Sequence, residues 1–293
     1  MTYYIDLRRY DLVLTTDFEF RHGISGHMFE LIEYYWLVKD NTKIKPCILL
    51  TDSTTKEEFS KALHSKYTNI DDIEDHIFVH EAPKILLTQA ILLVDGSGRG
   101  MQRSHVFAKS IFIFRCSESD FSYFEKNFDN VYLLQDFSVY GPSKNAVDYN
   151  KKILFSRLKI PRKGPKDTAM LYLTSTCRAI PQEDVTEIVK PFKDYVVLTN
   201  TPTLYNNSYQ VPVDNMFELF DTYIYTAIPK QFDCSSRLIK ECEYFGRKVI
   251  YNIDYIDKAL EVRRNNSIED VTLSSSDYFL ELINDKCKPP KHL

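Results

Sequence analysis

The sequence predicts an α/β protein in which parallel strands alternate with helices. Short apolar runs rich in β-branched and aromatic residues are separated by segments whose apolar residues recur at helical spacing. The connections between these runs are short, which is typical of a doubly wound sheet. The alternation occurs in both halves of the chain, and 293 residues are enough for two domains of typical size.

The composition is that of an ordinary globular protein, with 44% hydrophobic and 27% charged residues. A net charge of −4 argues against a generally basic nucleic-acid-binding protein. The six cysteines form no C-x-x-C pair, which argues against a zinc site or a disulfide framework and fits a reducing cytoplasm. No apolar run is as long as a membrane span, and the N-terminus lacks the features of a signal peptide. We expect a cytoplasmic protein without stable membrane insertion, and we expect it to be a monomer.

The first domain is expected to span residues 1–148 and to contain a sheet of buried strands. Its strands are predicted at 11–16, 46–52, 90–94, 110–115 and 130–134, with shorter runs at 75–80 and 84–87. Helices are predicted at 27–39, 54–65 and 118–127. The first of these helices has one apolar face, and the second begins at residues typical of a capping box.

The second domain is expected over 149–273. It starts with a basic segment, 151–166, which is interrupted by proline and glycine and whose apolar run 153–158 is predicted as a strand. Further strands are predicted at 169–174, 195–199, 223–226 and 248–251, and helices at 183–192, 213–221, 256–264 and 274–284.

Residues 222–251 carry the strongest pattern, which is a strand, a polar loop, a helix and a second strand. Ser235 or Ser236 is a good N-cap, and an apolar stripe at helical spacing follows. Gly246 suits the C′ position, where the backbone must be left-handed. Such a βαβ unit implies a parallel sheet, and its helix offers free N–H groups at the N-terminus to a phosphate.

Asp233 and Glu241 enclose seven residues, and a glycine turn and a strand follow them. This arrangement resembles the nucleotide-sugar site of glycosyltransferases with the GT-B fold. In that family the first acid lies beside the donor sugar, the amides between the acids hold the diphosphate, and the second acid binds the ribose. Here Asp233 stands where Glu is usual, and Cys234, Ser235 and Ser236 replace the usual glycine-rich filler. The alternative is an ordinary α/β crossover with a capped helix.

The resemblance implies two Rossmann-like domains that face a cleft, with a helix in the last segment, 274–293, that crosses back to the first domain. A second match is His22-Gly23-Ile24-Ser25-Gly26 after the first strand, which resembles the glycine-rich turn that faces the donor phosphates in this family. Arg178 and Lys230 also follow predicted strands, at places where members of this family contact the diphosphate. The donor-binding residues implied are Gly23, Ser25, Gly26, Arg178, Lys230, Cys234, Ser235, Ser236, Arg237 and Glu241.

Three residues are candidates for catalysis. Asp95 follows a strand end, where open α/β sheets bind ligands, and is the first candidate for the base that acts on the acceptor hydroxyl. The alternative is that Asp95 only makes a turn. His22 is a second candidate base, with a structural histidine as the alternative, and the resemblance places Asp233 beside the sugar. GT-B enzymes generally need no bound metal, so we expect no metal and no cofactor besides the nucleotide-sugar.

We therefore expect a glycosyltransferase that moves a sugar from a nucleotide-sugar, a UDP-sugar first of all, to a hydroxyl group. The compact, Tyr-, Phe- and Lys-rich chain resembles the phage DNA glycosyltransferases that modify hydroxymethylated pyrimidines. This implies double-stranded DNA as a partner, base flipping and, for a phage protein, the host cytoplasm. The residues assigned to DNA are Arg99, Arg103, Lys159, Arg162 and Lys163.

Two other functions stay open. One is a bacterial transferase for cell-surface polysaccharide or lipopolysaccharide, although no predicted helix has the basic face that docks such enzymes on membranes. The other is a GT-B-like protein that binds a nucleotide or a partner without any transfer reaction.

Overall fold

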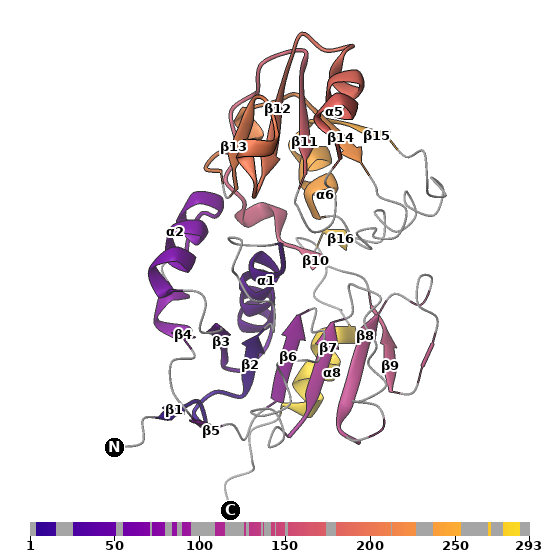
Figure 1. Ribbon diagram of the computed structural model, residues 1–293. Coiled ribbons are helices and arrows are strands. Elements are labelled where there is room, and N and C mark those ends of the chain that lie inside the picture. Colours follow the sequence, from indigo (N-terminus) through magenta and orange to yellow (C-terminus); the bar gives the residue numbers. More distant parts are fainter. Residues whose placement is uncertain are drawn as a thin grey trace, which may run out of the picture. The chain divides into compact units, whose positions relative to one another are not determined.

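The chain divides into two compact units (Figure 1). Unit 1 comprises Met1–His64, Asn69–Ser156 and Glu269–Leu293, and unit 2 comprises Ser65–Thr68 and Arg157–Ile268. The computed structural model describes residues 4–15, 26–50, 55–70, 72–79, 84–86, 90–94, 109–114, 126, 129–135, 137, 142–143, 145–149, 152–173, 180–211, 213–226, 237–252, 269–270 and 278–287.

Unit 1 is built on a seven-stranded sheet in which all neighbouring strands are parallel. Its strands are β2 (Leu12–Thr15), β3 (Pro46–Leu50), β4 (Ile77–Val79), β6 (Ala90–Val94), β7 (Ile111–Phe114), β8 (Val131–Gln135) and β9 (Ala146–Asp148). Their order in the sheet is β4-β3-β2-β6-β7-β8-β9. The chain thus starts in the middle at β2, builds outward to β4 and returns to the other side of β2. This is the strand order of a Rossmann-like sheet. The direction in which the chain adds strands across the sheet reverses between β2 and β6, and we call this place the reversal point.

Two short parallel pairs accompany this sheet. They are β1 (Tyr4–Asp6) with β5 (Lys84–Leu86), and β10 (Lys152–Ile153) with β16 (Glu269–Asp270).

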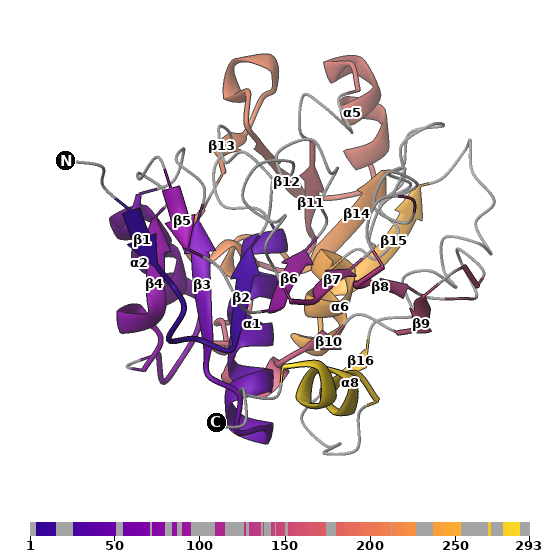
Figure 2. The same cartoon turned by 90° about the horizontal axis from the view of Figure 1, so that it is seen from below.

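In unit 1, helix α1 (Gly26–Asn41) packs against the sheet and helix α8 (Tyr278–Lys286) packs against α1. Helix α1 contacts β2, β3 and β6 (Figure 2). Helix α8 is held by Phe279, whose ring lies 5.5 Å from that of Tyr34 in α1 and 4.9 Å from that of Tyr149. A 3-10 helix, η1 (Glu74–His76), precedes β4.

Helix α2 (Lys56–Lys66) begins in unit 1 with the predicted capping box. The Glu58 amide donates to Thr55 Oγ1 at 3.1 Å, and the Thr55 amide donates to Glu58 Oε2 at 3.1 Å. Each side chain therefore satisfies an N–H group that the first turn of the helix leaves free.

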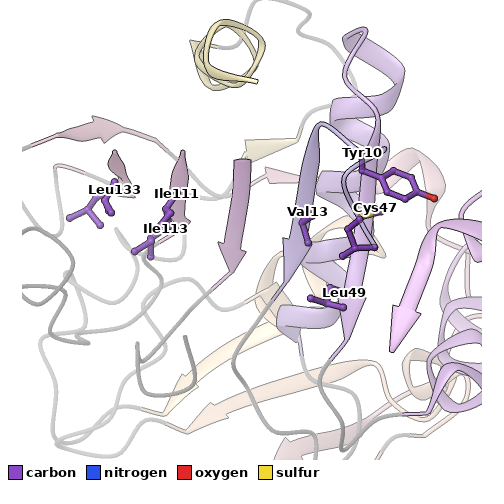
Figure 3. Packing of buried hydrophobic residues seen from close by; sticks show 9 residues of the cluster. Tyr10, Val13, Cys47, Leu49, Ile111, Ile113 and Leu133 are labelled. Atoms are coloured by element: carbon purple, nitrogen blue, oxygen red, sulfur yellow. The ribbon is translucent and has the colours of Figure 1, made fainter. Parts of the chain in front are cut away.

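One face of the unit 1 sheet forms an apolar core (Figure 3). Alternate residues of neighbouring strands meet there, among them Val13, Cys47, Leu49, Ile111 and Leu133. All residues of β2 and β3 are buried, because a parallel sheet is covered on both faces. This double coverage produces the continuous apolar runs from which the strands are predicted.

Unit 2 is built on a five-stranded sheet that is also entirely parallel. Its strands are β11 (Thr168–Tyr172), β12 (Asp194–Thr199), β13 (Ser208–Gln210), β14 (Thr222–Thr226) and β15 (Lys248–Asn252). Their order is β13-β12-β11-β14-β15, so this sheet is Rossmann-like as well and reverses between β11 and β14. The strands predicted at 169–174, 195–199, 223–226 and 248–251 are confirmed as β11, β12, β14 and β15, whereas β13 was not predicted.

Helices lie on both faces of the unit 2 sheet. On one face, α5 (Gln182–Val189) packs Val185 and Val189 against residues that include Ile224. On the other, α6 (Arg237–Tyr244) packs Ile239 and Cys242 against β14. The α/β class with parallel sheets is therefore confirmed.

Two local predictions in unit 2 and at its border are wrong. The strand predicted at 153–158 is the two-residue β10 followed by a 3-10 helix, η2 (Phe155–Arg157), and residues Phe155 and Leu158, three apart, are both buried. A spacing of three is the 3-10 period, and a short apolar run does not distinguish it from a strand. The helix predicted at 213–221 is only a 3-10 turn, η4 (Met216–Glu218), and a further turn, η3 (Pro202–Leu204), precedes β13.

The predicted helices at 118–127 and 256–264 lie outside the described residues, apart from residue 126. Among the residues that the structure does describe, no helix has both the length and the hydrophobicity needed to cross a membrane.

Candidate functional site

The reversal point of the unit 2 sheet brings together the ends of β11 and β14. These strands are parallel neighbours, with Ala169 paired to Thr222 and Leu171 paired to Ile224. Their carboxyl ends therefore lie at the same edge of the sheet. In open α/β sheets this is the place where ligands bind.

Most of the predicted donor residues follow strand ends at the two reversal points. Arg178 follows β11, and the residues from Lys230 to Ser236 follow β14. In unit 1 the glycine-rich turn follows β2, and Asp95 follows β6. The predicted residues outside the described part of the chain are His22, Gly23, Ser25, Asp95, Arg99, Arg103, Arg178, Lys230, Asp233, Cys234, Ser235 and Ser236. Their roles stay predictions.

Gly26, Arg237 and Glu241 are the predicted donor residues that the structure describes. Gly26 is the first residue of α1. Arg237 is the first residue of α6, and Glu241 lies one turn further on the same helix.

The C-terminus of α6 is built as the sequence predicts. Gly246 has φ 66, the Arg247 amide donates to the Cys242 carbonyl at 2.7 Å, and the Gly246 amide donates to the Glu243 carbonyl at 3.0 Å. This pair of hydrogen bonds is the Schellman motif, which needs a left-handed residue at C′. The prediction for Gly246 is confirmed, whereas the predicted N-cap lies outside the described residues.

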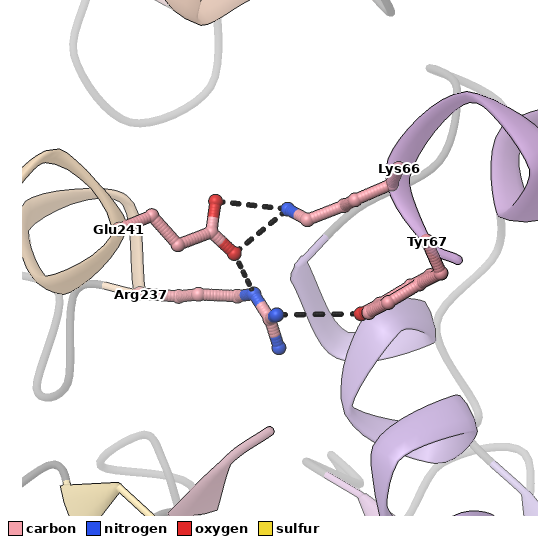
Figure 4. A network of polar contacts seen from close by, with 4 residues as sticks. All are labelled: Lys66, Tyr67, Arg237 and Glu241. Carbon is pink, nitrogen blue, oxygen red and sulfur yellow. Dashed lines mark hydrogen bonds and ion pairs between the residues drawn. The ribbon is translucent and has the colours of Figure 1, made fainter. Parts of the chain in front are cut away.

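Glu241 is the centre of a buried charge cluster that also contains Lys66, Tyr67 and Arg237 (Figure 4). Lys66 Nζ lies 2.8 Å from Glu241 Oε1 and 2.9 Å from Oε2. Arg237 Nε donates to Oε1, and Arg237 Nη2 donates to the Tyr67 hydroxyl at 3.3 Å. The Glu241 side chain is 1% exposed and that of Arg237 6%. All four residues belong to unit 2.

The cluster fixes the protonation state of Glu241. Burial would raise the pKa of this carboxyl group, but the charges and hydrogen bonds of Lys66 and Arg237 outweigh burial and lower the pKa. Glu241 is therefore ionised at neutral pH and neutralised by protein cations.

Backbone hydrogen bonds position Lys66 and Tyr67. Tyr67 forms an antiparallel bridge with Leu158. The Thr68 amide donates to the Arg157 carbonyl at 2.8 Å, and the Lys159 amide donates to the Lys66 carbonyl at 2.9 Å. Lys66 is the last residue of α2, Tyr67 forms the bridge directly after it, and the side chains of both contact residues of α6.

Sequence reasoning missed this cluster, although one signal was present. Arg237 and Glu241 are four positions apart on a helix, which is the spacing of an ion pair. Lys66 lies 175 positions before Glu241, and no local pattern links the two.

The predicted DNA-binding residues that the structure describes lie on an exposed loop of unit 2. Lys159, Arg162 and Lys163 are exposed there, and Ile160 between them is 85% exposed. This basic loop, 159–166, therefore presents cations around one apolar side chain.

Contacts to the rest of unit 2 hold the backbone of the basic loop. The Arg162 amide donates to Glu218 at 3.1 Å, and the Arg247 guanidinium donates to the Arg162 carbonyl at 2.6 Å. A Cβ atom at Gly164 would overlap the Phe220 carbonyl, so only glycine fits there. The loop is consequently fixed while its cationic side chains point outward.

No set of three or more His, Cys, Asp or Glu side chains within the described residues is arranged to hold a metal ion. The described cysteines, Cys47, Cys242 and Cys287, are buried, and burial raises the pKa of each thiol, for Cys287 to about 12. These three thiols are therefore poor nucleophiles and poor metal ligands.

No protein-family model matches this chain, and no curated protein matches it in sequence. The Rossmann-like class of the two sheets is accordingly established by their strand order alone.

Proposed function

We propose that this protein is a glycosyltransferase that uses a nucleotide-sugar, with the donor at the reversal point of the unit 2 sheet. The observation that carries the proposal is the strand order β13-β12-β11-β14-β15. It makes β11 and β14 neighbours, so the segments with Arg178 and with Lys230 start from adjacent strand ends. The Rossmann-like sheet of unit 1 supports a GT-B arrangement in which the two units form the lobes of the enzyme.

In the proposed reaction the acceptor hydroxyl attacks the sugar carbon as the bond to the diphosphate breaks. Negative charge then develops on the diphosphate. The amides of Ser235 and Ser236, together with Arg178 and Lys230, would stabilise that charge. Asp95 would take the proton of the acceptor hydroxyl, with His22 as the second candidate.

The acids of the motif have different positions in this proposal. Asp233 would lie beside the sugar. Glu241 would bind the ribose through Oε2, whose only described protein donor is Lys66. Because Glu241 is 1% exposed, a ribose reaches it only if a residue that covers it withdraws. The alternative is that Glu241 only fixes α6, which would favour a protein that binds nucleotides without transferring sugar.

We propose hydroxymethylated DNA as the acceptor. The basic loop supports this choice, because exposed cations on a fixed backbone attract the phosphates of DNA at little entropic cost. The protein as a whole carries a net charge of −4, so binding would depend on this local patch.

Two experiments test the function in sequence. Thermal unfolding with a panel of UDP-, GDP- and ADP-sugars should show a rise in Tm for one nucleotide class, because a ligand that binds only the folded state stabilises it. The protein and that donor should then increase the mass of DNA that contains hydroxymethylcytosine, and leave unmodified DNA unchanged. A panel without any Tm shift would exclude the glycosyltransferase, and a donor that binds without a mass change would exclude the DNA acceptor.

A further inference from the structure

Thr226 carries a buried hydroxyl group that no other described residue satisfies. It is the last residue of β14 and is 8% exposed. Its Oγ1 has no hydrogen-bond partner in the described part of the structure. A buried polar group of this kind is unusual in a folded protein, and a missing ligand is one explanation.

Two other threonines at strand ends show what the protein does elsewhere. Thr15, the last residue of β2, donates from Oγ1 to the Leu49 carbonyl at 3.0 Å. Thr199, the last residue of β12, accepts from the Thr201 amide at 3.1 Å. Both hydroxyl groups are buried and satisfied by the protein itself. Thr226 differs from them in lacking such a partner.

The position of Thr226 indicates the ligand. It ends the strand beside β11 at the reversal point, where a Rossmann-like sheet binds nucleotides. Since side chains alternate along a strand, Thr226 shares a face with Ile224, the face on which α5 packs. The segment that connects β11 to α5 contains Arg178. The strand that precedes this segment, β11, ends at the same edge of the sheet as Thr226.

We infer that the Thr226 hydroxyl donates a hydrogen bond to a phosphate oxygen of a nucleoside diphosphate. This inference rests on the proposed function and adds a residue that the motif does not contain. A hydroxyl that donates to an anionic oxygen forms a short, strong hydrogen bond. The described residues leave this donor unsatisfied, and a bound phosphate would satisfy it.

The inference predicts opposite effects of one substitution. Thr226→Val keeps the shape and replaces the hydroxyl by a methyl group. The Tm of the free protein should rise, because an unsatisfied buried group is removed. The affinity for UDP should fall about tenfold, because a charge-assisted hydrogen bond is lost. Thr226→Ser keeps the hydroxyl and should bind UDP within about threefold of wild type.

Thr199→Val is the matched control. It removes a hydroxyl that the protein already satisfies, so the Tm should fall and UDP affinity should stay unchanged. Calorimetric titration with UDP, GDP and ADP and a thermal scan without ligand give both readouts. If Thr226→Val binds UDP as wild type does, or lowers the Tm as Thr199→Val does, the inference is wrong and the proposed function stands. A wild-type protein that binds no nucleoside diphosphate would overturn both.

Discussion

Replacing Lys66 by methionine tests whether the buried charge cluster stabilises unit 2. The substitution keeps the length of the side chain and removes the ammonium group that lies 2.8 Å from Glu241 Oε1. Lys61, on the same helix, is exposed, so Lys61→Met makes the same chemical change without breaking a buried ion pair.

The expected loss follows from how deeply the pair is buried. Removing one partner of a buried ion pair costs about 3–5 kcal/mol when the other charge is left uncompensated. In Lys66→Met, Arg237 still neutralises Glu241, and Lys66 is 15% exposed in the wild type. We therefore expect about 3 kcal/mol, at the lower end of that range. Glu241→Gln should cost about 4–5 kcal/mol, because it removes the buried carboxylate charge that pairs with both Lys66 and Arg237.

Urea unfolding measures the loss, and hydrogen exchange locates it. The Tm should fall by roughly 6–12 °C for a chain of this size. The amides of Thr68 and Lys159 should exchange faster, because the segment 65–68 loses its side-chain anchor to α6. Lys61→Met should cost less than about 0.5 kcal/mol, as most surface substitutions do. If Lys66→Met costs no more than this control, the cluster does not stabilise the fold.

The same cluster should make the stability of the protein depend on pH in the acid range. The pKa of Glu241 is lowered from its ordinary value of 4.5 by folding. A group whose pKa falls on folding stabilises the protein above the unfolded pKa, and this contribution disappears as the pH falls through the folded pKa. The difference in unfolding free energy between wild type and Lys66→Met should thus be constant from neutral pH to about 5 and shrink below pH 4.5. A difference that does not change with pH would contradict the ion pair.

The remaining predictions concern two glycines and the basic loop. Gly246→Ala should cost about 1 kcal/mol of stability, because only the φ of 66 opposes a Cβ there. Gly164→Ala should cost about 3 kcal/mol, because its Cβ would overlap the Phe220 carbonyl. Urea unfolding that ranks the two variants in the opposite order would refute this. Arg162→Ala and Lys163→Ala should each reduce the slope of log K against log salt for DNA by about 1. Lys190→Ala removes an exposed cation outside the basic loop and should leave the slope unchanged. Three equal slopes would exclude the basic loop as the DNA-binding surface.

Much of the fold could be predicted because its signals are local. Central strands such as β2, β3 and β14 are buried at every residue, so they stand out as continuous apolar runs such as Pro46–Leu50. The end of α6 follows from Gly246, since few other residues adopt a left-handed backbone. The capping box of α2 depends on two residues three positions apart.

The predictions that failed concern segments whose conformation depends on distant partners. The apolar run 153–158 turns into a 3-10 helix after Ile153, and its buried Phe155 and Leu158 give no local signal that separates this helix from a strand. The segment 65–68 belongs to unit 2 through Leu158 and α6, and neither contact leaves a trace in the local pattern. The ion pair between Lys66 and Glu241 is likewise absent from the local motif, because the two residues are 175 positions apart, and the predicted ribose contact of Glu241 stays a prediction.

Glu241 and Thr226 differ in whether described protein groups already satisfy their hydrogen-bonding capacity. The Glu241 carboxylate is already bound by two protein cations, so a ligand gains little from it without first displacing them. The Thr226 hydroxyl has no such partner in the described structure, so a ligand gains the whole bond. Glu241→Gln should therefore lower stability more than UDP affinity, and Thr226→Val should do the reverse. If Glu241→Gln instead abolished UDP binding in a protein that still unfolds like wild type, the ribose contact would outweigh the ion pairs.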